Sequence, residues 1–524
     1  MIQILISNLT RSIISCFIHL RPSVRHTINV LDMALLGAGI GAILFYYLWW
    51  FQRLSFASPL LILGCLVALF YGCFQLLGNW ILYAVGPNPS QDEVPQNDSP
   101  TVDVLIPVLN ESFEMVETCL LAVKKMEGEY TIWLLDDGED SKLRKLAQDL
   151  QIGYLTRQGV DDAKAGNMNA ALPRIHGEIV AIFDIDHVPV PNYLTKTIGY
   201  FADNRVGFVQ VMPTFSNDDE SWLAQAAIDT SLDFYNPTSK GMDGLNCVTK
   251  MGSNCLIRRR TLDEIGGYQV GLAEDLATSI KIHATGWESR YVAEPLAPGL
   301  APATLSAWYT QQFKWSRGVF EVMLTSFSLI NQLRWGQRIC YAVRTTKYWI
   351  GLVIALHLAA IIIALFSADN ALLESLNGYM LHLVPLAVAD SLIRVYMFRK
   401  WRHPSIEASS FRQAVILIYA TWPIYTLAWF MSLLRIPLKY RLTPKSKTDS
   451  PPWSLFTLHL MTGFILLAGI IYTFSVLGHI PLVVLSFAMS QLIIHLFIIG
   501  LWRPTKYSQK MGEIDEVPSV LSSV

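Results

Sequence analysis

The sequence predicts an α/β domain with a mostly parallel sheet, inserted between two groups of membrane-spanning helices. The chain has 524 residues, of which 52% are hydrophobic and 16% are charged. Its mean hydropathy of +0.36 is too high for an ordinary soluble protein of this length. The long uncharged runs lie at 33–85 and 347–502, whereas most charged residues lie at 100–330. In that polar region strand-like and helix-like segments alternate, as expected for a mostly parallel sheet.

The composition also argues against two kinds of function. The net charge is −2 and no long block of lysine and arginine is present, so nucleic-acid binding is not expected. The seven cysteines form no CxxC pair, and several lie in apolar runs, where cysteine behaves as a small hydrophobe. We therefore expect neither a disulfide framework nor a zinc site.

The chain before the polar region is predicted to form one surface segment and two spans. In residues 1–32 apolar residues recur among arginines, which favours an interfacial helix over a signal sequence. Residues 33–51 and 59–84 are each long enough to cross a bilayer, which needs about 20 apolar residues. We therefore assign 33–86 to two transmembrane helices, and a polar linker rich in proline and asparagine follows them.

The segment 100–300 is predicted to be the α/β domain. Its expected strands are 102–108, 130–135, 152–156 and 178–184, and its expected helices are 112–126, 141–150 and 167–175. In such a sheet, ligands bind at the carboxyl ends of the strands. Acidic residues follow two of these strands, as Asp136-Asp137-Gly138 and as Asp184-Ile185-Asp186.

The chain after residue 300 is predicted to return to the membrane. Residues 301–345 are expected to form interfacial helices, and the segments 346–400 and 453–502 are each expected to hold two spans, at 347–366, 377–398, 455–475 and 480–502. Residues 408–436 are apolar but lie between two basic clusters, so this segment is expected to lie in the interface with both clusters on one side. Two spans before the domain and four after it place both termini, including the short tail 503–524, and the domain in the cytoplasm.

The two carboxylate pairs at strand ends are the first candidates for a functional site. Asp136 and Asp137 either close a turn and cap the next helix, or bind a cationic group, because unpaired carboxylates behind a buried strand are costly. Asp184 and Asp186 alternate along an extended stretch, so both side chains point to the same side. There, two hard oxygen ligands can share one Mg²⁺ or Mn²⁺.

Charged residues also mark two predicted helix starts. Lys164 lies in Ala-Lys-Ala-Gly-Asn, just before the helix expected at 167–175. A lysine beside a helix N-terminus suits a diphosphate, although a solvated lysine fits the same pattern. Glu274 and Asp275 begin another helix, where they either cap it or supply a base that takes a proton from an attacking hydroxyl. Farther on, 311–315 read Gln-Gln-Phe-Lys-Trp, which alone is also typical of an interfacial helix anchored by its tryptophan.

Taken in order, these motifs resemble those of the processive, inverting family-2 glycosyltransferases of the cellulose synthase type, a group that also includes hyaluronan, chitin and curdlan synthases. The series is DDG, AKAGN, DIDH, MGSN, AED and QQFKW. Residues 437–452, with Tyr440, Thr443 and Lys445, resemble the gating loop of that family. The resemblance covers about 100–450 and implies a cytosolic GT-A (Rossmann-like) domain inserted in an α-helical transmembrane bundle. The residues after 502 are too few for the PilZ domain of bacterial cellulose synthases, so regulation is expected from accessory subunits, or the product is another polymer.

The resemblance also implies a role for each motif. The residues expected to contact the donor nucleotide or its diphosphate are Asp136, Asp137, Lys164, Asp184, Gln311 and Lys314. Those expected to hold Mg²⁺ or Mn²⁺ are Asp184, Asp186 and His187. Asp275, beside Glu274, would be the general base, and the acceptor would meet Trp315, Gly252 and Ser253. The chain departs from the family pattern at Ala273, where Thr or Ser is usual, and at Lys314, where arginine would offer a two-pronged donor.

The expected activity is transfer of a sugar to the end of a growing β-linked polysaccharide that the protein also translocates, at the inner membrane of a bacterium. UDP-glucose is the leading donor on resemblance, and other donors would give hyaluronan-, chitin-, curdlan- or mannan-type polymers. Transfer of one sugar to a membrane lipid is an alternative that product length distinguishes. A transporter or receptor with a nucleotide-sensing domain is a third interpretation, and it predicts no turnover.

Overall fold

The computed structural model describes residues 29–53, 59–87, 100–407, 409, 411–437 and 456–500. The N-terminal segment up to residue 28, the loop with Tyr440, Thr443 and Lys445, and the tail 503–524 lie outside the described residues. The strands are β1 (Val102–Val108), β2 (Thr131–Asp136), β3 (Gly153–Leu155), β4 (Ile179–Ile182), β5 (Val206–Val211), β6 (Thr214–Phe215), β7 (Cys255–Arg258), β8 (Glu288–Val292) and β9 (Pro298–Gly299).

The helices fall into three groups along the chain. Before the sheet domain come α2 (Val30–Arg53) and α3 (Pro59–Val85). Those within it are α4 (Phe113–Val123), α5 (Ser141–Asp149), α6 (Ala163–Ala171), α7 (Tyr193–Thr197), α8 (Trp222–Asp233), α9 (Ser239–Gly244), α10 (Arg259–Ile265) and α11 (Glu274–Ala284). Those after it are α12 (Leu305–Thr325), α13 (Trp335–Thr346), α14 (Ile350–Ser367), α15 (Asn370–Trp401), α16 (Arg412–Ala420), α17 (Trp422–Leu433), α18 (Thr457–Leu477) and α19 (Leu482–Gly500).

A seven-stranded sheet in the order β3-β2-β1-β4-β7-β5-β8 forms the centre of the α/β domain. Neighbouring strands run parallel except around β7, which is antiparallel to both β4 and β5. Successive side chains of a strand point to opposite faces. Accordingly Val104 and Ile106 of β1 pack with α4, whereas Leu105 packs with α6. Both faces of the sheet are therefore covered by helices, and the predicted α/β architecture is confirmed.

The start of α6 differs from the sequence prediction. The helix was expected at 167–175, but it begins at Ala163 and takes up the Ala-Lys-Ala-Gly-Asn motif as its first turns. The chain enters it through Asp162 and Ala163, both with positive φ. A Cβ on Gly166 would lie 2.2 Å from the carbonyl oxygen of Asp161, so only glycine fits this tight entry.

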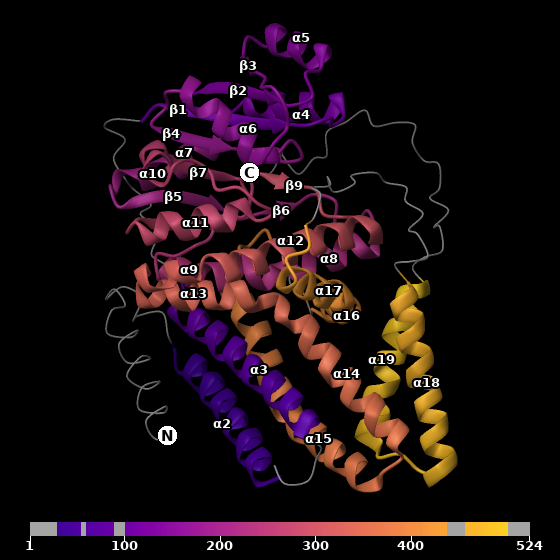
Figure 1. Ribbon diagram of the computed structural model, residues 1–524. Helices are drawn as coiled ribbons and strands as arrows, with labels where there is room; N and C mark the ends of the chain where they lie inside the picture. Colours follow the sequence, from indigo (N-terminus) through magenta and orange to yellow (C-terminus); the bar gives the residue numbers. More distant parts are fainter. Residues whose placement is uncertain are drawn as a thin grey trace.

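Three layers are visible in Figure 1: the sheet domain at the top, a band of helices below it, and long helices at the bottom. The band consists of α8, α9, α12 and α13, with α16 and α17 beside α12. Packing joins the layers, because α11 of the sheet domain contacts α12 of the band, and α9 and α13 of the band contact the long helix α3. The band therefore lies between the polar domain and the apolar helices.

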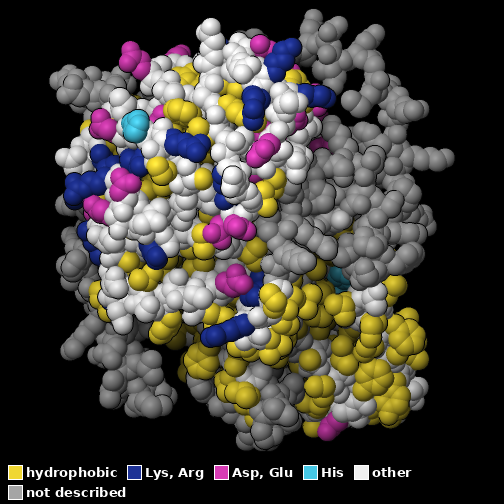
Figure 2. Space-filling view, turned by 45° about the horizontal axis from the view of Figure 1, so that its top comes forward, with side chains coloured by type: hydrophobic (Ala, Val, Ile, Leu, Met, Phe, Trp, Pro, Cys, Tyr) yellow, Lys and Arg dark blue, Asp and Glu magenta, His cyan; other side chains and the backbone are white. Residues whose placement is uncertain are grey.

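Six helices of the described chain are long and apolar enough to cross a membrane, so this is a membrane protein. They are Val30–Trp50, Ile62–Val85, Trp335–Ser367, Asn370–Trp401, Thr457–Leu477 and Leu482–Gly500. Each of the six predicted spans overlaps one of these helices over most of its length. In Figure 2 the face below the sheet domain is dominated by apolar side chains, whereas charged side chains of both signs cover the domain. The segment expected in the interface is a pair, α16 and α17, bent by 47° at their junction, with Pro423 in the first turn of α17.

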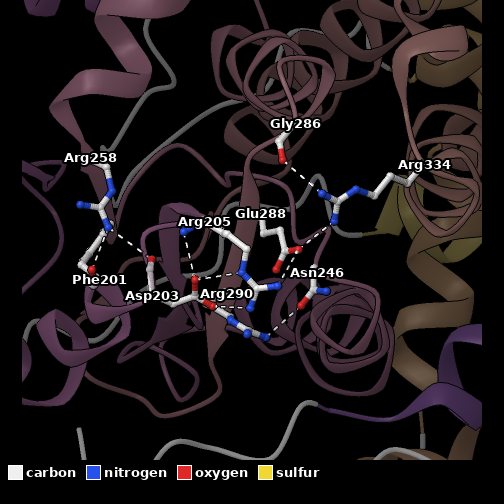
Figure 3. A network of polar contacts seen from close by, with 9 residues as sticks. All are labelled: Phe201, Asp203, Arg205, Asn246, Arg258, Gly286, Glu288, Arg290 and Arg334. Carbon is white, nitrogen blue, oxygen red and sulfur yellow. Dashed lines mark hydrogen bonds and ion pairs between the residues drawn. The ribbon is translucent and has the colours of Figure 1, made fainter. Parts of the chain in front are cut away.

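Polar contacts fix the band of helices to the sheet, as Figure 3 shows. Arg334, which precedes α13, binds the buried Glu288 of β8 at 2.7 Å. Glu288 also lies 3.8 Å from Arg205, whose guanidinium contacts Asp203 at 2.8 Å. On the other side of the band, α9 meets α3 at Gly241, where a Cβ would lie 2.1 Å from the carbonyl oxygen of Leu82.

Candidate functional site

A cavity of about 820 Å³ lies between the carboxyl ends of β1, β2 and β4 and the helices α8, α12 and α13. Nearly all of the described residues that the sequence singled out line this cavity. They are Asp137, Lys164, Asp184, Asp186, His187, Gly252, Ser253, Glu274, Asp275, Gln311, Lys314 and Trp315. The structure thus brings together segments separated by almost two hundred positions in the chain.

Asp136 is the exception, because it is fully buried and does not line the cavity. Its Oδ1 accepts a hydrogen bond from the Gly138 amide, and its Oδ2 accepts from the Asp140 amide and the Tyr154 hydroxyl, all at 2.8 Å. Both carboxylate oxygens are therefore used to close the turn after β2. The structure gives Asp136 the turn-closing role and does not place it where a donor contact was expected.

Asp137 does line the cavity, and it is held there by Arg157. The two side chains form a two-pronged ion pair, with Nε to Oδ1 and Nη2 to Oδ2 both at 2.8 Å. Arg157 also donates to the carbonyl oxygens of Asp161 at 2.7 Å and Ala163 at 3.0 Å. This arginine therefore ties the turn after β2 to the start of α6. The sequence alone gave no reason to select it.

Lys164 extends from the first turn of α6 to Asp184 at the end of β4. The two side chains form an ion pair, and the ammonium also donates to the Gly252 carbonyl oxygen at 2.9 Å. Burial by itself would raise the pKa of the Asp184 carboxyl, but the Lys164 ammonium, helped by His187, holds that pKa below its usual range. Asp184 is therefore an anion at neutral pH.

Asp184, Asp186 and His187 form a group whose chemistry fits a divalent cation. Each offers one ligand atom, and these atoms all lie within 4.8 Å of one another. The Nδ1 of His187 is buried without a hydrogen-bond partner, 3.5 Å from an Asp186 oxygen. A buried ring nitrogen that lacks a partner is costly unless a ligand binds it. Gly299 makes room for the ring, because a Cβ there would lie 2.7 Å from His187 Nε2.

The Met-Gly-Ser-Asn loop is held rigidly beside this group. Gly252 has a φ of +88°, which glycine adopts without strain. The hydroxyl of Ser253 accepts from the Asp184 amide at 2.9 Å and donates to Asn254 at 3.1 Å. Gln210 of β5 braces the loop from below by bonding the Met251 amide and the Ser253 carbonyl oxygen, both at 2.9 Å. Ser253 therefore faces the cavity with a hydroxyl that already orients the backbone of Asp184.

Glu274 and Asp275 occupy the first turn of α11. The N-cap position belongs to Ala273, so neither carboxylate occupies it. Asp275 Oδ1 accepts from the Leu276 amide at 2.8 Å. Burial and the neighbouring Asp275 carboxylate raise the pKa of the Glu274 carboxyl. Below this turn, Gly318 lets α12 approach closely, because a Cβ there would lie 2.8 Å from the Ala273 nitrogen.

Comparison with known proteins agrees with this geometry. Residues 103–266 match the family described as Glycosyl transferase family 2, and residues 263–450 match the family described as Cellulose synthase. These two matches follow one another along the chain and include every motif of the cavity.

Residues 103–450 form a family-2 glycosyltransferase region of the cellulose synthase type.

Curated relatives of this glycosyltransferase region carry the name cellulose synthase catalytic subunit [UDP-forming]. The protein of Pseudomonas fluorescens (strain SBW25) is 31% identical over 352 residues, which are 65% of this chain and 48% of that protein. The protein of Xanthomonas axonopodis pv. citri (strain 306) is 34% identical over 315 residues, 56% of this chain and 43% of that protein. The match therefore spans less than half the length of these relatives. Among solved structures, a mannosyltransferase from Pyrobaculum calidifontis in complex with GDP-Man and Mn²⁺ is 16% identical, covers 72% of this chain and 100% of its own, and has a TM-score of 0.47.

In the glycosyltransferase region, one stripe of α12 faces the cavity. Gln311, Lys314 and Trp315 line the cavity, and Gly318 continues the same face, a spacing of three and four residues that places them on one side of a helix. Gln312 is largely buried and also lines the cavity, and its side-chain oxygen accepts a hydrogen bond from the Tyr425 hydroxyl at 2.8 Å. The tryptophan is therefore part of the cavity wall, whereas the sequence alone also allowed a membrane anchor.

Several cavity residues of the glycosyltransferase region were not selected from the sequence. Arg344, Lys347 and Tyr425 line its lower part. The sequence signal was weak, because basic and aromatic residues beside an apolar run are also typical of a membrane boundary. Among the aromatic residues in and beside the spans, Tyr348 lines the cavity, whereas Tyr46 and Trp80 are buried among the helices.

Proposed function

We propose that the protein is an inverting β-glycosyltransferase that adds sugars from UDP-glucose to the end of a growing β-linked polysaccharide. The observation that supports this most directly is the single cavity in which Lys164, the Asp184–Asp186–His187 group and Asp275 face Trp315. Such a cavity provides a cationic group for a diphosphate, ligands for a metal, a base, and an aromatic ring for a sugar. The relatives named cellulose synthase catalytic subunit [UDP-forming] support the donor and the product.

Each group of residues in the cavity would have one role in the reaction. Lys164, Asp137, Gln311 and Lys314 would bind the donor nucleotide. Asp184, Asp186 and His187 would hold Mg²⁺ or Mn²⁺, which when bound neutralises charge on the leaving diphosphate. Asp275 would take the proton from the acceptor hydroxyl as that oxygen attacks the anomeric carbon, so a single displacement converts an α-linked donor into a β-linked product. Glu274 lies beside this base, and burial and the Asp275 carboxylate raise the pKa of its carboxyl. Trp315, with Gly252 and Ser253, would border the acceptor.

The membrane helices would place this reaction at an inner membrane, with the sheet domain in the cytoplasm. If there are six spans, with α16 and α17 lying in the interface, both ends of the chain would be on the side of the domain. In this arrangement the band of α8, α9, α12 and α13 would lie at the membrane surface, and the glycan would leave the cavity between the spans.

The test is to supply membranes containing the full-length protein with a panel of radiolabelled nucleotide sugars and to size the product. We expect UDP-glucose to be incorporated into a long polymer that a β-glucanase degrades. A single glucose on a lipid would instead favour a glycolipid synthase. If no donor gave either sugar transfer or release of its nucleoside diphosphate, the protein would not be a glycosyltransferase.

The matched control is Asp275→Asn, which keeps the size and hydrogen-bonding shape of the side chain. This variant should bind UDP-glucose with nearly unchanged affinity, since the carboxylate acts only on the acceptor. It should lose transfer by on the order of a hundredfold or more, the usual contribution of a general base. Full activity in this variant would remove Asp275 from the mechanism.

A further inference from the structure

Lys250 is a lysine that lies directly before the Met-Gly-Ser-Asn loop. It is almost completely buried, and it does not line the cavity. Its ammonium lies over the ring of Tyr268 and forms no ion pair or hydrogen bond within the described part of the chain. Burying an ammonium without an anionic partner is costly, and an aromatic ring compensates only part of that cost. An apolar side chain would avoid the cost, so a functional reason for the lysine is expected.

A chain of two hydrogen bonds connects Lys250 to the first turn of α11. The Lys250 amide donates to the Ser279 hydroxyl at 2.8 Å, and that hydroxyl donates to the Asp275 carbonyl oxygen at 2.7 Å. Neither Lys250 nor Ser279 lines the cavity, so this connection runs behind the cavity wall. Burial lowers the pKa of the Lys250 ammonium, and the nearby Asp275 and Glu274 carboxylates act in the opposite direction. The ammonium and the two carboxylates therefore attract one another.

The first turn of α11 needs positive charge around it because two carboxylates are adjacent there. Burial and the Asp275 carboxylate raise the pKa of the Glu274 carboxyl, and lysines of the cavity oppose this effect. The titratable groups that face this turn come from several elements: Lys164 of α6, Lys250, Lys314 of α12, and the buried Cys255, Tyr235 and Tyr348. Burial favours the uncharged form of the thiol and of the two phenols. Among these groups, the three lysines therefore supply the positive charge.

The donor nucleotide would engage two of these three lysines. Lys164 and Lys314 line the cavity and are the residues proposed to bind the donor diphosphate. When the diphosphate binds, its negative charge offsets the charge of those two ammonium groups. Lys250 stays behind the cavity wall, where the donor does not reach it. Its charge therefore continues to act on Asp275 in the donor-bound enzyme, the state in which the acceptor hydroxyl loses its proton.

We propose that Lys250 is a positioning residue that acts on the base through its charge: it keeps Asp275 ionised while the donor occupies the cavity. This role rests on the proposed function, because it requires Asp275 to be the general base. It adds to the reaction a residue that touches neither donor nor acceptor and that lies on the far side of the base. The stability lost by burying the ammonium is then offset by activity at neutral and mildly acidic pH.

The test is the pH dependence of sugar transfer from UDP-glucose by the full-length enzyme in nanodiscs, with wild type compared with Lys250→Met. Without the ammonium Asp275 is harder to ionise, so the acid limb of the kcat profile should move to higher pH by about one unit, the lower end of the effect of a neighbouring opposite charge. The shift in kcat/KM should be smaller. That quantity reports the free enzyme, in which no diphosphate offsets Lys164 and Lys314.

Further substitutions separate the charge of Lys250 from its shape. Lys250→Gln also removes the charge and should give the same shift, whereas Lys250→Arg keeps the charge and should retain the wild-type acid limb. The matched control is Lys240→Met, which removes a half-buried ammonium of α9 that donates to the Trp401 carbonyl oxygen and does not line the cavity. This control should leave the acid limb in place. The melting temperature and the UDP-glucose affinity of each variant establish that it is folded.

The role of Lys250 is overturned if both neutral variants keep the wild-type acid limb, if Lys250→Arg shifts it as far as Lys250→Met does, or if Lys240→Met shifts it equally. In each of these cases Asp275→Asn would still be inactive, so the proposed function would stand. Full activity of Asp275→Asn would instead remove the base itself, and the role of Lys250 with it.

Discussion

His187 reaches the candidate metal group only because Gly299 has no side chain. Gly299→Ala would place a methyl group 2.7 Å from His187 Nε2, and the ring can turn away at little cost to the fold. We therefore expect Mn²⁺ affinity to fall by about tenfold, in the range found when groups that support a ligand are altered, with the melting temperature nearly unchanged. Titration of Mn²⁺ followed by electron paramagnetic resonance measures this directly. Unchanged Mn²⁺ affinity would show that His187 is not a ligand.

Lys250 illustrates the cost of a buried charge beside the site. Its side chain is only 2% exposed, its ammonium lies 4.6 Å from the Tyr268 ring centroid, and burial lowers its pKa from the ordinary value of 10.5. Between that lowered pKa and about 10.5 the unfolded chain binds more protons than the folded chain, so stability rises with pH across this window. At pH 7 the burial of this ammonium lowers the free energy of unfolding.

Lys250→Met should therefore raise the apparent melting temperature at pH 7 by a few degrees and flatten its rise toward pH 10. The reason is that methionine fills a similar volume without a charge to bury. Thermal melting in detergent at several pH values measures both effects. The exposed Lys145→Met on α5 is the control and should change neither. A lower melting temperature for Lys250→Met would show that the ammonium stabilises the fold.

At the scale of elements, α12 is placed by a single glycine. A Cβ at Gly318 would lie 2.8 Å from both the nitrogen and the Cβ of Ala273. Backbone atoms yield less readily than a flexible side chain, so Gly318→Ala should shift α12 relative to Asp275. We expect transfer to fall by about tenfold to a hundredfold, because a displacement of about 1 Å can have that effect, while UDP-glucose binding falls less. Initial rates and donor titration separate the two quantities.

The control for this prediction is Gly72→Ala in α3, where a Cβ would meet no atom within 4 Å. Alanine is the better helix former, so this variant should fold and transfer as the wild type does. Equal activity of the two variants would mean that the contact between α12 and Ala273 does not set the geometry of the site.

At the scale of the whole molecule, the sheet domain is docked on the spans through close backbone contact. Gly241 of α9 faces Leu82 of α3, where a Cβ would lie 2.1 Å from the carbonyl oxygen and 2.5 Å from the carbonyl carbon. Gly241→Ala should force the two helices apart at a cost of about 1–3 kcal/mol, as overpacking does. We expect a lower melting temperature and a loss of transfer.

The comparison for this variant is Gly41→Ala in α2, since a Cβ there meets no atom within 4 Å. Thermal melting of both proteins in the same detergent gives the difference. If Gly241→Ala melts at the wild-type temperature, the domain is held by other contacts, such as the Arg334–Glu288 ion pair of Figure 3.

The parts predicted correctly from the sequence have a local cause. Strands β1 to β4 were found because apolar runs lie between turn residues, and the spans were found because their length is set by the bilayer. The start of α6 was predicted four residues late, because its entry depends on two positive φ values and on Arg157, which is remote in sequence from the aspartate it binds. The turn-closing role of Asp136 and the connection of Lys250 to the first turn of α11 likewise depend on tertiary contacts that no local pattern contains.

The ion pair between Lys164 and Asp184 links the binding of a metal ion to the binding of a nucleotide. Any cation bound by Asp184 competes with the Lys164 ammonium for one carboxylate, whereas a diphosphate offers that ammonium a second anion. Lys164 therefore releases Asp184 most readily when a cation and a diphosphate bind together. Reciprocity then requires nucleotide to tighten metal binding by the same factor by which metal tightens nucleotide binding. The protein would in this way select the metal–nucleotide complex over a cation that is merely abundant.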